Sequence, residues 1–211
     1  MKNLFITFEG IEGCGKSTQA KLLEKYLIEK GHQVLLTREP GGPAISEKIR
    51  NILLDNDNAE MTPQVELLLF LAARNQHTIQ WIKPALEKGT LVISDRYADS
   101  TLAYQGAARH IDIQTTKQLN NFATSGLTPD ITFIIDIPVE ILPQRLSGKK
   151  LDRLEQESKE FHKEVRNAFC NLCSSQTAEQ TQTYYLIDGT QTIDEIHNQI
   201  VEIINNATLR I

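Results

Sequence analysis

Short apolar runs alternate along this chain with longer segments of helical periodicity. The runs are rich in Ile, Leu, Val, Phe and Thr, and several are apolar at every position, which is typical of parallel strands covered by helices on both faces. We predict strands over residues 4–8, 33–37, 91–94, 131–137 and 184–187. The segments between them are long enough to hold crossover helices.

Helical periodicity is clear over residues 19–30 and 63–87. Near the end of the chain, Ile193, Ile196, Ile200 and Ile203 form one apolar stripe. The resulting order of strands and helices predicts an α/β fold with a doubly wound parallel sheet, in which ligands bind beyond the carboxyl ends of the strands. There is no internal repeat, low-complexity tract or linker, so we expect residues 1–211 to form one domain.

The composition narrows the class of protein. With 40% hydrophobic and 23% charged residues among 211, the chain is globular rather than disordered and can bury a full core without disulfides or a structural metal. Its 27 acidic and 22 basic residues give a formal charge of −5, which argues against general affinity for nucleic acid or anionic lipid. An anionic ligand must therefore meet basic groups locally.

Two further features bear on the compartment. No apolar run approaches the ~20 residues that span a bilayer, and the sequence turns polar and Gly-rich too early for a signal peptide, so we expect a cytoplasmic protein. Of the three cysteines, Cys14 lies in a Gly-rich segment while Cys170 and Cys173 share a helical stretch. No strand, Pro or Gly precedes that pair, so we expect partly buried thiols rather than a redox site.

The segment GIEGCGKS directly follows the first predicted strand and precedes a helix. It fits the phosphate-binding pattern G-x-x-x-x-G-K-[ST], in which glycines let successive N–H groups converge on phosphate oxygens. Lys16 would neutralise the β and γ phosphates and Ser17 would ligate Mg²⁺. The predicted ATP site therefore comprises Gly10, Ile11, Glu12, Gly13, Cys14, Gly15, Lys16, Ser17 and Thr18.

A phosphate loop is shared by GTPases, ATPases and small-molecule kinases, and other residues must separate them. The chain has no N-K-x-D stretch for guanine and no D-x-x-G switch element, which disfavours a GTPase. Six arginines stand near the predicted cleft instead. Arg38 and Arg96 follow predicted strands, Arg50 and Arg74 lie on nearby helices, and Arg145 and Arg153 flank a Gly-Lys-Lys turn. Any one of them could form a surface ion pair, but as a set they indicate a second phosphorylated substrate.

Several motifs in one order resemble bacterial thymidylate kinases. They are Arg-Glu-Pro-Gly-Gly from Arg38, Phe70-x-x-x-Arg74, Asp95-Arg96-Tyr97, the segment STLAYQG from Ser100, and Leu-Asp-Arg ending at Arg153. The resemblance covers essentially the whole chain. It implies a P-loop NTPase-like fold and phosphoryl transfer from ATP to dTMP with Mg²⁺, usually in a homodimer.

The resemblance also assigns roles to individual residues. Arg96 and Arg50 would bind the dTMP phosphate, Arg74 a thymine carbonyl, and Tyr104 would pack beneath the deoxyribose, where a 2′-hydroxyl would clash. Phe70 would stack on the thymine ring, although the residue pattern alone, without the resemblance, favours a core aromatic at this position. The remaining substrate residues are Glu39, Ser100, Thr101 and Gln105, and Asp95 joins Ser17 near the metal.

Two charged features of the phosphate site need explanation. Glu12 is a carboxylate where phosphate binds, and we interpret it as orienting the acceptor rather than acting as a general base; a loop-tip Glu facing solvent is the alternative. The loop carries no arginine, unlike that of some family members, so the transition-state cation must come from elsewhere. We expect a lid at about residues 145–157 to supply Arg153, with Arg145 at the ATP and Lys149 and Lys150 as further basic residues.

Departures from the family pattern are few: Pro43 stands where a Thr commonly follows Arg-Glu-Pro-Gly-Gly, and the lid segment is short. Asp188-Gly189-Thr190 resembles the family's adenine-side loop but is also an ordinary turn. Two other functions stay open at this level. One is a kinase for another nucleoside monophosphate or a deoxynucleoside, and the other is a regulatory module that binds nucleotide without transferring phosphate.

Overall fold

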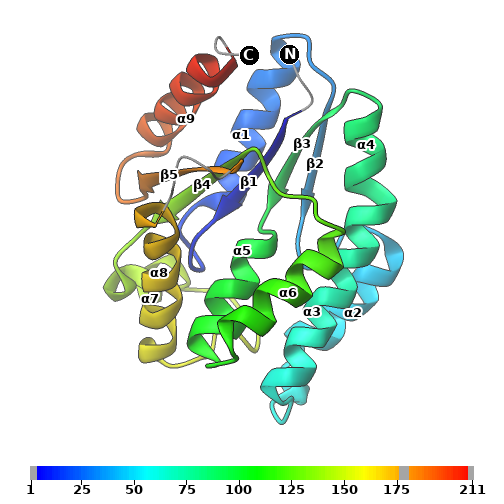
Figure 1. Cartoon of the computed structure of the whole chain (residues 1–211). Helices are drawn as coiled ribbons and strands as arrows, with labels where there is room; N and C mark the ends of the chain where they lie inside the picture. The colour runs from blue at the N-terminus through cyan, green and yellow to red at the C-terminus, as the bar shows by residue number, and fades with distance from the viewer. Residues whose placement is uncertain (1–3, 176–180, 209–211) are drawn as a thin grey trace.

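A parallel sheet of five strands lies at the centre of the computed structural model, which describes residues 4–175 and 181–208 (Figure 1). The strands are β1 (Phe5–Glu9), β2 (Val34–Arg38), β3 (Leu91–Asp95), β4 (Ile131–Asp136) and β5 (Thr183–Asp188). Their order across the sheet is β2-β3-β1-β4-β5, so the chain builds one side of β1 before crossing to the other. This confirms the predicted doubly wound α/β fold.

The predicted strand boundaries are wrong by about one residue, and the difference has a common cause. Four strands continue past the last apolar position to a charged residue, namely Glu9, Arg38, Asp95 and Asp188, whereas β4 stops at Asp136. The parallel pairing between strands includes these terminal residues, since Arg38 is in register with Asp95, and Asp136 with Asp188. Charged side chains therefore gather at the carboxyl edge of the sheet.

Helices lie on both sides of the sheet (Figure 1). Helix α1 packs on β1, β2 and β3, while α8 packs on β4 and β5. No helix in the described part of the chain is both long and apolar enough to cross a membrane. The α-helices are α1 (Lys16–Glu29), α2 (Ala44–Leu54), α3 (Pro63–His77), α4 (Lys83–Glu87), α5 (Ala98–Thr101), α6 (Ile113–Thr124), α7 (Leu142–Arg145), α8 (Lys159–Ser174) and α9 (Ile193–Thr208). Short 3₁₀ turns occupy η1 (Asn56–Asn58) and η4 (Val139–Ile141), and π-helical turns occupy η2 (Thr78–Ile82) and η3 (Leu102–Ala108).

The segment of helical periodicity over residues 63–87 is helical throughout, as predicted, but it is not one regular α-helix. The segment is α3, then the π-helical turn η2, then α4, which has Pro84 in its first turn. Proline has no N–H to donate and its ring crowds the preceding turn, so a wider turn before it relieves the helix. Thr78 and Ile82 of η2 are both buried, and Ile82 packs against the strand residues Phe5 and Val92.

The core confirms most of the predicted apolar faces. Leu23 and Leu27 of α1 share a cluster with Ile196 and Ile200 of α9. The α9 stripe continues through Ile204, however, and not through the predicted Ile193, which is 56% exposed. Cys170 and Cys173 are half-buried free thiols on α8, as expected.

Candidate active site

A cleft of about 260 Å³ opens at the carboxyl ends of β1, β2 and β3. Its wall combines the phosphate loop with side chains from α2, α3, α5 and η3, which the sheet order brings together. Every residue predicted for the second substrate lines it: Glu39, Arg50, Phe70, Arg74, Arg96, Ser100, Thr101, Tyr104 and Gln105. Phe70 is half-buried in this wall and belongs to no core cluster of the described residues, contrary to its reading as a core aromatic.

The phosphate loop has the backbone that its glycines predict. Gly10 has φ +136°, and a Cβ there would lie 2.4 Å from the carbonyl oxygen of Ile135, so no other residue fits. Lys16 is buried, and its Nζ donates to the carbonyl oxygen of Ile11 at 2.7 Å. The Ser17 hydroxyl donates to a carboxylate oxygen of Asp95. Lys16 and Ser17 thus line the cleft from the start of α1, whereas Thr18 does not.

Glu12 is tied to the acceptor side of the cleft and does not extend into solvent. Its Oε1 accepts from Arg96 at 3.0 Å and from the Tyr104 hydroxyl at 2.6 Å. Burial alone would raise the pKa of Glu12, but the charges of Arg96 and Lys16 outweigh it and hold that pKa below its usual range. The carboxylate therefore stays ionised and unsuited to general-base work, as the sequence analysis infers.

Glu9, at the end of β1, is a positioning residue that the sequence analysis missed. It is fully buried and accepts from the backbone N–H groups of Tyr97 and Ser100 and from the Ser100 hydroxyl, at 2.7, 3.2 and 2.6 Å. Burial, with the nearby charge of Asp99, raises the pKa of Glu9 to about 7. These bonds hold the turn that carries Arg96, whose φ of 73° is unusual for a side chain of its size.

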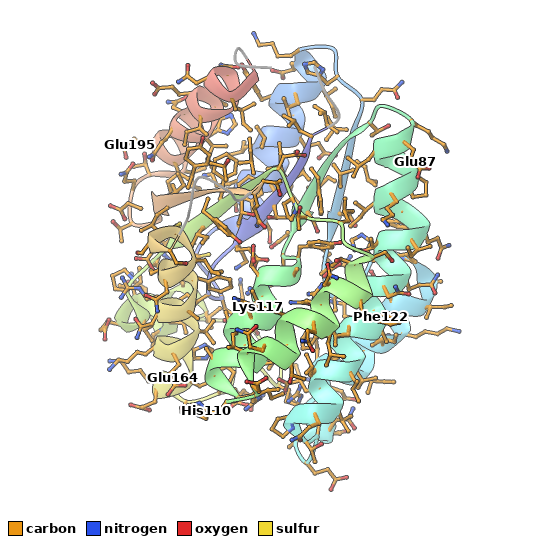
Figure 2. All side chains as sticks on the ribbon, in the orientation of Figure 1. Glu87, His110, Lys117, Phe122, Glu164 and Glu195 are labelled. Atoms are coloured by element: carbon orange, nitrogen blue, oxygen red, sulfur yellow. The ribbon has the colours of Figure 1, made fainter. Side chains whose placement is uncertain are left out.

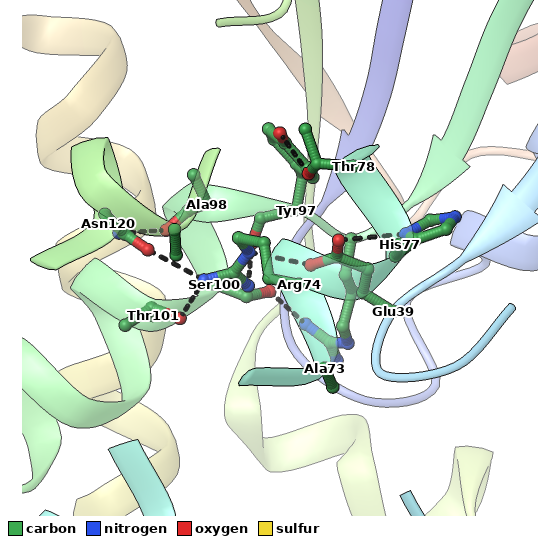
Figure 3. Close-up of polar contacts among 12 residues, drawn as sticks. Glu39, Ala73, Arg74, His77, Thr78, Tyr97, Ala98, Ser100, Thr101 and Asn120 are labelled. Carbon is green, nitrogen blue, oxygen red and sulfur yellow. Dashed lines mark hydrogen bonds and ion pairs between the residues drawn. The ribbon is translucent and has the colours of Figure 1, made fainter. Parts of the chain in front are cut away.

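The Arg74 guanidinium is the centre of a buried polar network (Figure 3). It donates to Glu39 at 2.8 Å and to Thr101 at 2.6 Å, and the other oxygen of Glu39 lies 3.0 Å from His77. The remaining partners of Arg74 are Asn120 at 2.7 Å and the Tyr97 carbonyl at 2.8 Å. Arg74 therefore fixes the floor of the cleft as well as lining it, and neither His77 nor Asn120 was predicted.

Arg38 and Arg50 make the outer edge of the cleft basic. Arg38 pairs with Glu47 at 3.0 Å, while Arg50 donates to the neutral carbonyl oxygen of Pro40 at 2.7 Å. Burial and the charge of Arg38 lower the pKa of Arg50. Because Arg50 donates this hydrogen bond to a neutral carbonyl group, its positive charge is available for an anion.

Arg153 lies away from the phosphate loop in this structure, and its role over bound ATP stays a prediction. Its side chain is 7% exposed, with NH1 2.6 Å from Glu66 of α3 and Nε donating to the carbonyl oxygen of Leu53 at 2.9 Å. Glu66 is fully buried and also binds Arg109 and Gln105. A buried carboxylate attracts the nearest guanidinium strongly, so Arg153 anchors the lid, and Lys149 lines the cleft instead.

Arg145 lies at the outer end of the phosphate loop. It is exposed, its Cβ stands over Gly13, and its NH2 donates to the carbonyl oxygen of Gly189 at 3.3 Å. Asp188 accepts from both the backbone N–H and the hydroxyl of Thr190, which is the ordinary turn foreseen for this tripeptide. The turn and Arg145 nevertheless lie together beside the loop.

The protein combines a parallel sheet with a phosphate loop that faces a basic cleft for a second ligand. This combination defines a P-loop nucleotide kinase. Comparison with known proteins agrees. The family model described as thymidylate kinase matches residues 8–200. The chain is 48% identical over 202 residues to the thymidylate kinase of Fervidobacterium nodosum, which covers 96% of this chain and 98% of that protein.

Other relatives give the same result. The thymidylate kinase of Thermosipho africanus is 49% identical over 201 residues, covering 95% of this chain and 97% of that protein. The crystal structure of thymidylate kinase from Ehrlichia chaffeensis matches with a TM-score of 0.76 and 35% identity, over 96% of this chain and 98% of that one. The chain belongs to the thymidylate kinase family, as its motifs predicted.

Proposed function

We propose that this protein transfers the γ-phosphoryl group of ATP to dTMP, giving dTDP and ADP. The observation that carries the proposal is a single cleft with a phosphate loop at one end and Phe70, Arg74 and Tyr104 at the other. A half-buried aromatic ring beside a guanidinium suits a flat base with carbonyl groups, and the arginines between suit its phosphate. Family membership supports the same assignment.

Catalysis is positioning and charge neutralisation. Arg96 and Arg50 hold the acceptor phosphate so that one of its oxygens attacks the γ-phosphorus, and the bond from that phosphorus to the β–γ bridging oxygen breaks. Lys16 balances the negative charge that develops on the departing ADP. Glu12 orients Arg96 and the acceptor without removing a proton, because the attacking oxygen is already anionic near neutral pH.

The proposal includes Mg²⁺ bound with ATP. The oxygen donors of Ser17 and Asp95, in contact at the edge of the phosphate loop, suit this hard cation, which takes few protein ligands and keeps water and phosphate oxygens. Among the described residues no group of three or more His, Cys, Asp or Glu could hold a metal by itself, which is consistent with such a shared site. When bound, Mg²⁺ would neutralise the β and γ phosphates.

A coupled assay for ADP release tests the function. We expect release to depend on both dTMP and Mg²⁺, and to be at least tenfold slower with dGMP, dCMP, dAMP or thymidine as acceptor. ADP release that is indifferent to dTMP would instead indicate nucleotide binding without transfer. A faster rate with another acceptor would move the assignment to another nucleotide kinase.

Tyr104 gives a prediction about the sugar. Its ring is 4% exposed and packs against Phe161 and Phe169 at centroid distances of 6.0 and 6.2 Å. We expect Tyr104→Ala to admit ribo-TMP at least tenfold better relative to dTMP, because the ring that excludes a 2′-hydroxyl is gone. Tyr104→Phe, which keeps the ring, should retain the discrimination. Unchanged kcat/KM ratios for the two acceptors in Tyr104→Ala would exclude this ring as the sugar gate.

The lid gives a second prediction, revised by the position of Arg153. We expect Lys149→Ala to lower kcat at least tenfold, since Lys149 is the basic lid residue in the cleft wall. The exposed neighbour Lys150, which does not line the cleft, is the matched control, and Lys150→Ala should stay within threefold. Single-turnover kinetics with ATP would measure both. Equal losses in the two variants would argue against a specific role for Lys149.

Apolar side chains on adjacent helices support a homodimer. Ile45 and Ile52 of α2, Leu68 of α3 and Phe122 of α6 are 54%, 48%, 57% and 80% exposed, and Phe122 extends from the outer surface of α6 (Figure 2). Burying such surface in a second copy is favourable at roughly 25 cal/mol per Å². We expect Phe122→Glu to convert a dimer to a monomer in light scattering. A wild-type monomer would contradict the proposed homodimer. A cytoplasmic location is also part of the proposal.

A further inference from the structure

Two buried polar groups, Glu12 Oε2 and the His162 ring, face each other behind the phosphate loop without a hydrogen bond between them. Glu12 uses only Oε1 for its bonds to Arg96 and Tyr104, and its Oε2 has no hydrogen-bond partner among the described residues. His162 of α8 is 2% exposed, and neither of its ring nitrogens makes a hydrogen bond within residues 4–175 and 181–208. The His162 Nδ1 lies 3.6 Å from the free Oε2, just beyond hydrogen-bond distance.

An unmade bond of this kind is costly inside a protein. Leaving a buried acceptor or donor unpaired costs about 1–3 kcal/mol, and more where the group is charged. A small shift of the ring would pair both groups, and the surroundings allow one. A cavity of about 440 Å³, bordered by α7, α8 and the lid, lies against His162.

We propose that His162 is a positioning residue that holds the Oε2 of Glu12 during the reaction. The inference rests on the proposed function, in which Arg96 holds the acceptor phosphate. Glu12 then shares the charge of Arg96 with that phosphate. An Nδ1–H bond from His162 keeps the carboxylate oriented and offsets its charge at the moment when two phosphates enter the site.

A near-isosteric pair of variants tests this role. Asn places an amide N–H close to where Nδ1 stands, whereas Leu has a similar shape and no polar atom. We expect His162→Leu to lower kcat about tenfold with the KM for ATP within twofold, and His162→Asn to recover most of that loss. His110→Leu is the control, since His110 forms an exposed pair at 3.7 Å with Glu164 of α8, the helix that also carries His162 (Figure 2). It should leave kcat unchanged.

A double-mutant cycle with Glu12→Gln separates pairing from general packing. If the two groups act together, His162→Leu has little further effect on kcat in the Glu12→Gln background. Equal losses for Leu and Asn, or an undiminished loss in that background, would overturn the inference. Should the wild type lack dTMP-dependent activity, the proposed function fails. The inference is then decided by the same cycle in thermal unfolding, where additive changes in midpoint overturn it and non-additive changes support it.

Discussion

Lys16→Ala is expected to lower kcat by about a thousandfold, which corresponds to ~4 kcal/mol of transition-state stabilisation. The ammonium group is buried in the wall of the cleft, where its charge is poorly screened and faces the developing negative charge of the leaving group. Its contact with the Ile11 carbonyl already holds it inside the loop before ATP arrives. Little reorganisation is then needed during the reaction.

The measurement is kcat with saturating ATP, Mg²⁺ and dTMP, with folding checked by circular dichroism. Lys25→Ala is the matched control because Lys25 lies on the same helix, with a 75% exposed side chain paired to Glu29. It should keep full activity. Turnover of Lys16→Ala within tenfold of wild type would contradict the assignment of the phosphate loop.

Arg74→Ala is expected to lower the free energy of unfolding by about 3–5 kcal/mol. The reason is that Glu39, which is 3% exposed, would keep its charge in the interior, and His77 would be its one remaining ion-pair partner in the described part of the chain. Thr101, Asn120 and the Tyr97 carbonyl would each lose a partner as well. Few single substitutions remove so many buried contacts.

Urea denaturation measures this effect, and Arg38→Ala is its control. Arg38 also pairs with a glutamate at 3.0 Å, but its side chain is 48% exposed, so its loss should cost under ~1 kcal/mol. Where Arg74→Ala still folds, the KM for dTMP should rise far more than that for ATP, because an unpaired thymine carbonyl is costly in a dry pocket. Equal changes in the two KM values would make Arg74 purely structural.

The sequence predicted the fold and the cleft because both depend on local patterns. Apolar runs define the strands, and the loop from Gly10 to Ser17 carries its chemistry in contiguous residues. Substrate residues such as Phe70 and Tyr104 could be assigned only through the resemblance to a family, since their meeting depends on how α3 and η3 pack.

What the sequence could not predict depends on partners distant along the chain. Arg153 appeared free to reach ATP because nothing nearby in sequence marks Glu66 as its buried partner. Glu9 carried one overlooked signal, a carboxylate at the end of an apolar strand just before the phosphate loop. His162 carried none, because only the packing of α8 brings it to Glu12.

The two anchors of the lid limit how far it can travel. Leu146 is buried in the core on one side and Arg153 is held by Glu66 on the other, which leaves only residues 147–152 between them. Six residues span at most ~20 Å even when fully extended. The closure that we expect over ATP is therefore a local rearrangement of this short loop, and the radius of gyration should be the same with and without nucleotides.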